Sequence, residues 1–205
     1  VAVHLDHGYS YEGVMKAIRW GFTSIMFDGS RLSAEENIKK TRDITRIAHS
    51  LGISVEGELG YVGCYPHAAD LTDENLVQPE LAAHFVEKTK IDALAVAVGT
   101  SHGEYHGTTR LNFSRLQELS SAVHVPLVMH GGSRLTKDDY KQSIAAGISK
   151  INIATDMSQA ASETLKSQLS QTPRANYISL MTSVKKGVKD SVRKYMLSFD
   201  CITKG

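Results

Sequence analysis

The sequence predicts an α/β fold of the (β/α)8 barrel (TIM barrel) type, and two observations support it. Short apolar runs alternate with segments of helical periodicity, which is typical of parallel strands joined by helices. Polar residues follow each run at its carboxyl end, where such a barrel gathers its active site. The six runs are Val1–His4, Ser24–Phe27, Ser54–Leu59, Ala93–Val98, Pro126–Met129 and Lys150–Ile153.

Apolar residues at helical spacing mark the intervening segments. They are Val14 and Ile18, Ile44 to Leu51, Leu81 and Phe85, Tyr140 to Gly147, and, near the end of the chain, Val184 to Met196. Glycine follows three of these segments, at Gly21, Gly52 and Gly147. We expect these glycines to end helices in the left-handed conformation.

The length bears on how much of a barrel is present. A complete barrel takes about 250 residues, and this chain has 205. Because residue 1 already lies inside an apolar run, we expect residues to be missing before Val1 and the first two βα units to be absent. We expect one catalytic domain over residues 1–205. An open doubly wound sheet is the alternative, but no Gly-x-Gly-x-x-Gly motif follows the first run.

Composition excludes several classes of protein. The net charge of +1 gives no reason to expect binding to nucleic acid or to a membrane surface. The longest apolar run, residues 93–98, is too short to cross a bilayer. Cys64 and Cys201 lie far apart, which suits a reducing compartment, and we expect a cytoplasmic protein.

Three histidines follow apolar runs and precede glycine: His7, His102 and His130. Histidine is a common zinc ligand, so three strand-end histidines predict an open metal site with room for substrate. Asp6 precedes His7, and a turn of the chain there would let both side chains reach one cavity. The alternative for Asp6 and His7 alone is a core histidine beside a capping aspartate.

Carboxylates end two further runs. Asp28 follows the second run, and Glu56 and Glu58 share one face of the third. They could bind metal, orient a histidine or neutralise positive charge. For Asp28 the alternative is helix capping together with Ser30.

Glycine and hydroxyl residues where strands give way to helices predict a phosphate site. Backbone amides at a helix N-terminus bind phosphate, although ordinary capping would explain the same residue types. The residues are Gly103, Gly131, Gly132, Ser133, Asn152, Thr155 and Asp156. The irregular stretch Gly60 to Pro79 is either an active-site cover or a passive surface insertion.

Together these motifs resemble the class II, zinc-dependent ketose-bisphosphate aldolases. The resemblance runs from Val1 to about Leu169. It depends on the order and spacing of HLDHG at residues 4–8, DGS at 28–30, EGELG at 56–60, GTSHG at 99–103, HGGS at 130–133 and NIATD at 152–156.

The resemblance implies cleavage of a ketose phosphate, such as fructose- or tagatose-1,6-bisphosphate, to dihydroxyacetone phosphate and an aldehyde through an enediolate that zinc stabilises. Zinc would be bound by His7, His102 and His130, with Glu58 nearby and Asp28 at an alternative metal position. Asp6 would be the acid–base residue. Dihydroxyacetone phosphate would be held by Gly103, Gly131, Ser133, Asn152 and Thr155. A sodium or potassium ion near Gly103 and Gly131, and a homodimer or homotetramer, are further expectations.

The chain departs from the family pattern in three places. No glutamate of the usual loop motif occurs in residues 63–70, which leaves Asp70 or His67 as the second acid–base residue. Arg134 replaces a glycine, and Ala154 replaces an aspartate of one branch. The identity of the substrate sugar is therefore not decided by the sequence.

Three alternatives remain: a Schiff-base mechanism through Lys150, a metal-dependent hydrolase on the same barrel, and an inactive paralogue that acts as a binding or assembly protein.

Overall fold

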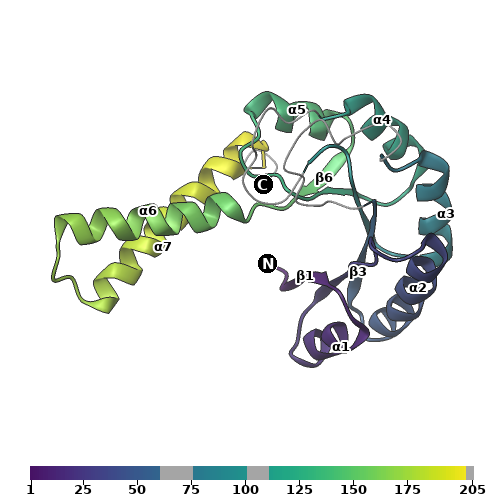
Figure 1. Cartoon of the computed structure of the whole chain (residues 1–205), viewed down its shortest axis with the longest axis horizontal. Coiled ribbons are helices and arrows are strands. Elements are labelled where there is room, and N and C mark those ends of the chain that lie inside the picture. The colour runs from purple at the N-terminus through teal and green to yellow at the C-terminus, as the bar shows by residue number, and fades with distance from the viewer. Residues whose placement is uncertain (61–75, 101–110, 202–205) are drawn as a thin grey trace.

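The computed structural model describes residues 1–60, 76–100 and 111–201. Within these ranges, six parallel strands form one curved sheet in sequence order (Figure 1). They are β1 His4–Gly8, β2 Ser24–Phe27, β3 Ser54–Leu59, β4 Ala93–Val96, β5 Leu127–Met129 and β6 Ile148–Ile151. The expected α/β class is confirmed as a parallel, six-stranded half-barrel. The absence of the first two βα units stays a prediction.

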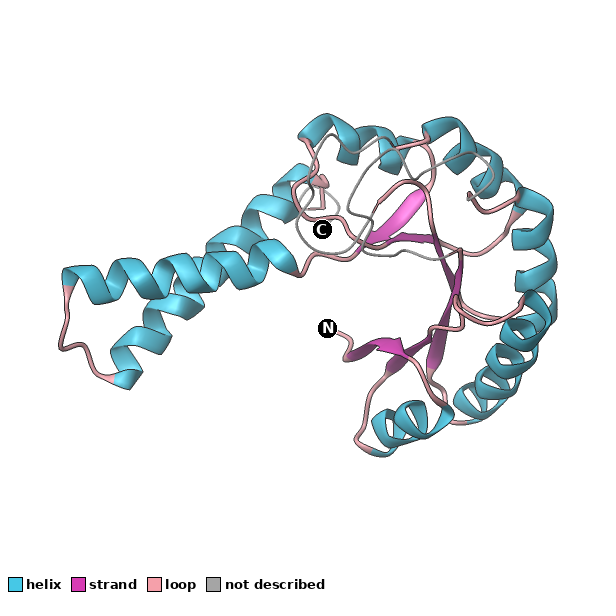
Figure 2. Cartoon of the chain, viewed as in Figure 1, coloured by secondary structure: helices cyan, strands magenta, loops and turns pink. Residues whose placement is uncertain are grey.

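Helices line the outer side of the curved sheet, and a helical hairpin projects beyond it (Figure 2). The outer helices are α1 Tyr11–Arg19, α2 Ala34–Ser50, α3 Pro79–Thr89, α4 Phe113–Ala122 and α5 Lys137–Ala145. The hairpin consists of α6 Thr155–Gln171 and α7 Tyr177–Ser198. Among the described helices, none is both long enough and apolar enough to cross a membrane.

The two faces of the sheet differ in chemistry. The outer face packs apolar side chains such as Ile25 and Leu94 against the helices, where Phe85 is fully buried. The inner face holds a small apolar cluster of Met26, Ala95 and Val128 beside buried carboxylates. Because side chains alternate along a strand, each strand delivers every second residue to the inner face.

Local sequence sets the helix boundaries. The hydroxyl of Ser33 accepts a hydrogen bond from the backbone N–H of Glu36, and Thr136 forms a capping box with Asp139. Glycines end three helices with positive φ, at Gly21 (87°), Gly52 (70°) and Gly147 (114°). The expected left-handed glycines are confirmed.

Two strands were predicted at the wrong residues, and one helix was not predicted. The first strand is His4–Gly8 rather than Val1–His4, because the parallel pairing with β2 begins at His4 and Ser24. The last strand is Ile148–Ile151 rather than Lys150–Ile153, since it pairs with Leu127–Met129 from Ile148 onward. Helix α4 was not predicted, because its two buried residues, Leu116 and Leu119, stand among polar residues in a helix of only 10 residues.

A buried asparagine ties α2 to the strand that carries the inner carboxylates. The Asn37 amide nitrogen donates to the backbone carbonyl of Glu58 over 2.9 Å, and its oxygen accepts from the Thr41 hydroxyl over 2.9 Å. Asn37 is 2% exposed, so water cannot replace either bond.

Asn37→Ala should therefore lower the free energy of unfolding by about 1–3 kcal/mol, because it leaves buried polar groups without partners. Urea unfolding measures the loss. Lys39→Ala, at an exposed position of α2, is the control and should leave stability nearly unchanged. Equal stability of the two variants would contradict this role of Asn37.

Candidate metal centre and active site

The site begins with an irregularity in β1. His7 has a φ of 59°, and the pairing of β1 with β2 shifts between Leu5 and Gly8. Regular alternation would send Asp6 and His7 to opposite faces. Here the Oδ1 atom of Asp6 lies 3.7 Å from Nε2 of His7. The local distortion thus brings both side chains to one site, as the expected turn of the chain required.

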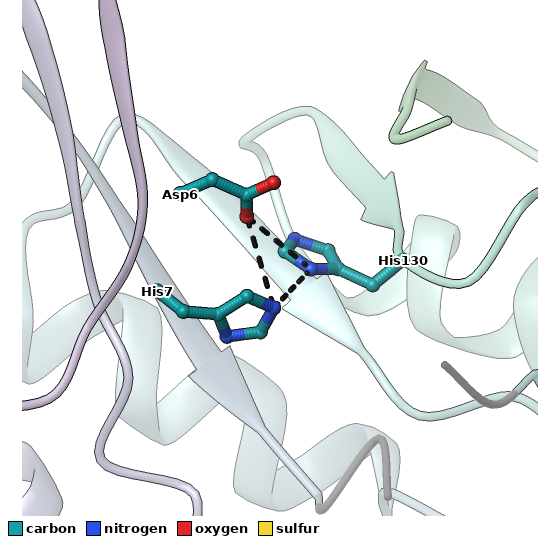
Figure 3. A group of neighbouring side chains, drawn as sticks. All are labelled: Asp6, His7 and His130. Atoms are coloured by element: carbon teal, nitrogen blue, oxygen red, sulfur yellow. Dashed lines mark hydrogen bonds and ion pairs between the residues drawn. The ribbon is translucent and has the colours of Figure 1, made fainter. Parts of the chain in front are cut away.

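Two imidazole rings meet at the centre of this site. Nε2 of His7 lies 3.0 Å from Nδ1 of His130, which directly follows β5 (Figure 3). The ring planes are inclined by 77°. His130 is fully buried, and the His7 side chain is 16% exposed, so the pair opens to solvent on the His7 side.

Each ring has a carboxylate on its far side. Oδ2 of Asp28 lies 2.7 Å from Nδ1 of His7, and Oε1 of Glu56 lies 2.8 Å from Nε2 of His130. A carboxylate accepts hydrogen bonds, so we assign the ring hydrogen to these two nitrogens. In the neutral rings the two nitrogens that face one another then both present lone pairs.

This donor arrangement fits a metal ion. Two facing lone pairs repel, whereas a shared cation stabilises both. Two nitrogen ligands of a tetrahedral zinc ion stand about 3.3 Å apart, close to the 3.0 Å between these atoms. A carboxylate behind each histidine is also the usual support of metal-bound imidazole.

Asp6 and Asn152 border the two histidines. Oδ1 of Asp6 is 3.8 Å from Nδ1 of His130 and accepts a hydrogen bond from the Asn152 amide over 3.2 Å. The Asp6 side chain is 50% exposed, in contrast to the buried carboxylates. Asp6 therefore lies where the site opens to solvent.

Glu58 and Asp28 form a second group on the other side of His7. Oε2 of Glu58 is 3.7 Å from Nδ1 of His7, and the Glu58 side chain is 1% exposed. Ligand atoms of His7, Asp28 and Glu58 lie close enough together to hold a cation. The His7 ring thus separates two candidate metal positions, one at Nε2 and one at Nδ1.

The electrostatics favour ionised carboxylates and a basic His7. Burial alone would lower the pKa of His7, but the hydrogen bond to Asp28 and the charge of Glu58 raise it above its ordinary value. Burial raises the pKa of Asp28, but hydrogen bonds from His7 and Ser30 outweigh it and hold that pKa low. The pKa of Glu56 is likewise lowered, because His130 and Lys150 outweigh its burial.

The predicted phosphate residues gather where β5 and β6 end. Gly132 is packed so closely that an added Cβ would lie 2.5 Å from a side-chain carbon of Ile151. Ser133 is 5% exposed, and Thr155 begins α6, which has no side-chain cap of its own. The Ser133 hydroxyl accepts a hydrogen bond from the backbone N–H of Asp156 over 3.4 Å, and backbone amides beside a hydroxyl at a helix N-terminus are groups that bind phosphate.

Asp156 fastens this region to α7. Its Oδ2 atom accepts hydrogen bonds from the backbone N–H of Arg134 and from the Tyr195 hydroxyl. Arg134 has a φ of 64°, and its side chain turns along α6 to donate to Gln159 over 2.9 Å. The Arg134 side chain is therefore held against α6 by Gln159.

The structure brings together most of the predicted site residues that it describes. Asp6, His7, Asp28, Glu58, His130 and Asn152 line one region, and Gly131, Ser133 and Thr155 lie at the adjoining strand ends. His102 and Gly103, together with the loop residues His67 and Asp70, lie outside the described residues. The specific contact between Glu56 and His130 was missed; the shared face of Glu56 and Glu58 was its only signal.

A parallel half-barrel with a candidate metal site at the carboxyl ends of its strands has the architecture of a TIM-barrel enzyme, whose active site lies at that end. Comparison with known proteins identifies the family. The sequence profile of the class-II fructose-bisphosphate aldolases matches residues 1–204. The chain belongs to this family, and the resemblance seen in its motifs is confirmed.

The relatives and solved structures agree with this assignment. A sulfofructosephosphate aldolase from Alkalicoccus urumqiensis is 42% identical over 180 residues, which cover 87% of this chain and 63% of that protein. The chain thus spans less than two thirds of that relative's length. The YdjI aldolase of Escherichia coli K12 superposes with a TM-score of 0.84 at 38% identity, covering 96% of this chain and 68% of that one. A Coccidioides immitis protein proposed to be a fructose-1,6-biphosphate aldolase gives 0.87 at 30% identity, with coverages of 97% and 71%.

The anchor between α7 and Asp156 leads to a stability prediction. Tyr195→Phe removes a hydrogen bond to a carboxylate and should lower the free energy of unfolding by about 1.5–3 kcal/mol. Chemical denaturation measures the change, with Tyr177→Phe as the control because that tyrosine is 74% exposed. A change within about 0.5 kcal/mol, the range of ordinary surface substitutions, would contradict the anchoring role.

Proposed function

We propose that this protein is a zinc-dependent aldolase that cleaves a ketose phosphate to dihydroxyacetone phosphate and an aldehyde. The observation that carries the proposal is the pair of facing nitrogens, Nε2 of His7 and Nδ1 of His130, each backed by a carboxylate. Family membership supplies the reaction class, and the name of the Alkalicoccus relative points to a ketose phosphate as substrate.

His7 and His130 would hold the metal, with His102 as the third ligand. Zinc, when bound, supplies Lewis-acid stabilisation of negative charge on the substrate oxygens. Glu58 and Asp28 would hold the alternative metal position beside Nδ1 of His7. Both imidazoles would bind as neutral ligands, so the cation would keep its full charge.

Asp6 would move the proton. In cleavage, the Asp6 carboxylate would take the proton of the C4 hydroxyl while the C3–C4 bond breaks. The electron pair of that bond goes to the dihydroxyacetone phosphate half, and the C4 oxygen becomes the aldehyde carbonyl. In condensation Asp6 returns that proton. Asn152 holds Oδ1 of Asp6 by its amide N–H over 3.2 Å, which orients the carboxylate.

The phosphate of dihydroxyacetone phosphate would lie at the N-terminus of α6. Gly131 and Gly103 would offer backbone N–H groups, and Ser133, Asn152 and Thr155 would offer side-chain hydrogen bonds. The helix dipole and the backbone amides of the first turn favour a dianion there. A sodium or potassium ion near Gly103 and Gly131 is part of the same proposal.

The reaction is tested with purified full-length protein and a panel of fructose 1,6-bisphosphate, tagatose 1,6-bisphosphate and sulfofructose phosphate. Release of dihydroxyacetone phosphate is measured by a coupled reductase. Chelation should abolish cleavage and zinc should restore it, whereas borohydride with substrate should leave the enzyme active. Inactivation by borohydride would instead support a Schiff base.

Asp6→Asn separates proton transfer from metal binding. We expect kcat to fall about 10²–10⁴-fold, the usual contribution of a positioned acid–base group. Zinc affinity, measured by competition with a chromophoric chelator, should stay close to that of the wild type. A fully active Asp6→Asn enzyme would exclude the acid–base role.

Asp28→Asn tests the support of His7. The amide keeps the shape of the carboxylate but loses its charge, so zinc affinity should fall about 10–100-fold. Asp43→Asn, on helix α2, serves as the control with an unchanged affinity. Wild-type affinity in Asp28→Asn would show that His7 needs no carboxylate behind it.

A further inference from the structure

The buried carboxylate of Glu56 connects three strands on the inner face. Its Oε1 atom accepts from His130, and its Oε2 atom forms an ion pair with Nζ of Lys150 over 2.7 Å. Nε2 of His4 lies 3.7 Å from the same Oε2 atom. The Glu56 side chain is 3% exposed, so these partners rather than water determine how the carboxylate is turned.

Lys150 reaches Glu56 from the far side of the half-barrel. It lies in β6, where it pairs in register with Val128 of β5, two residues before His130. Its side chain is 38% exposed, so the ammonium group bridges solvent and the buried carboxylate. The two oxygens of Glu56 are thereby divided, one toward Lys150 and one toward His130.

This division decides which nitrogen His130 turns toward His7. With Oε2 held by Lys150, Oε1 stays 2.8 Å from Nε2 of His130. This contact is shorter than the 3.2 Å from the Asn152 amide nitrogen to the same atom, so we assign the hydrogen to Nε2. Nδ1 then presents its lone pair toward His7. Without the ion pair, the carboxylate can rotate about its side-chain bonds, and the bond to Nε2 loses its fixed acceptor.

We propose that Lys150 is a positioning residue which, through Glu56, holds His130 with Nδ1 available for metal. The inference rests on the proposed function in so far as His7 and His130 form the metal site. It assigns Lys150 a role different from a Schiff-base nucleophile, since its ammonium group is paired with a buried carboxylate.

A positioning role of Lys150 and simple charge repulsion by Lys150 predict opposite changes in zinc affinity when its charge is removed, so the role can be tested. A lysine ammonium group near a divalent cation repels it, so removing that charge would tighten metal binding if repulsion were its main effect. A positioning role predicts weaker binding on removal, because the histidine ligand is no longer oriented. Whether zinc affinity rises or falls therefore distinguishes charge repulsion from positioning.

The experiment measures zinc affinity by chelator competition, without substrate, in Lys150→Met, Lys150→Gln and Lys150→Arg. The two neutral variants should bind zinc about 10–100-fold more weakly, the usual effect of losing support for a metal-bound histidine. Lys150→Arg keeps the cation and should stay near wild type. The visible absorption of bound cobalt(II) should change in the neutral variants only.

A matched control comes from an ion pair of the same length on the outer surface. Nζ of Lys16 lies 2.7 Å from Glu12 on α1, and Lys16→Met should leave zinc affinity unchanged. Circular dichroism checks folding; should Lys150→Met fail to fold, Lys150→Gln carries the test.

Wild-type or tighter zinc binding in the folded neutral variants would overturn the positioning role. Absence of zinc binding in the wild-type protein would overturn the proposed function instead. Absence of aldol cleavage, with the expected order of zinc affinities intact, would contradict the proposed reaction and leave the role of Lys150 standing.

Discussion

The site depends on two imidazole rings that meet nitrogen to nitrogen, with a carboxylate behind each. The strands that bring them, β1 and β5, are four positions apart in the sheet. In a flat sheet those strands would be separated by about 19 Å, at roughly 4.8 Å per strand. The facing ring nitrogens are 3.0 Å apart. The two histidines can therefore meet only because the sheet is curved.

The inner face combines this curvature with an unusual concentration of charge. Glu56 and Glu58 are buried, and the Asp28 side chain beside them is 6% exposed. Buried carboxylates are costly unless cations or hydrogen bonds compensate them. Here the histidines, Lys150 and the backbone N–H and hydroxyl of Ser30 do so, and the remaining negative charge suits a positive ion.

Much of the fold could be predicted because its signals are local. Alternation of apolar runs with helical segments indicated the parallel α/β class, and Gly21, Gly52 and Gly147 marked helix ends. The strand boundaries at Val1 and Ile153 were wrong because an apolar run does not show where pairing with a neighbour begins. Register depends on residues that are distant in sequence, such as Ser24 opposite His4.

For the site, residue types and strand ends singled out His7, His130, Asp6 and Asp28. What sequence could not decide was the partner of each ring nitrogen. The Glu56 and Glu58 carboxylates share a face and look equivalent, yet the structure places Glu56 behind His130 and Glu58 beside His7. The positive φ of His7, which brings Asp6 to the site, is likewise a feature of three-dimensional packing.

The most direct test of the account is the tautomer of the two histidines, measured by long-range proton–nitrogen NMR on protein labelled with nitrogen-15 histidine. The account predicts hydrogen on Nδ1 of His7 and on Nε2 of His130. Added zinc should then shift the resonances of Nε2 of His7 and Nδ1 of His130. The opposite tautomer in either ring, or no shift of these two nitrogens with zinc, would contradict it.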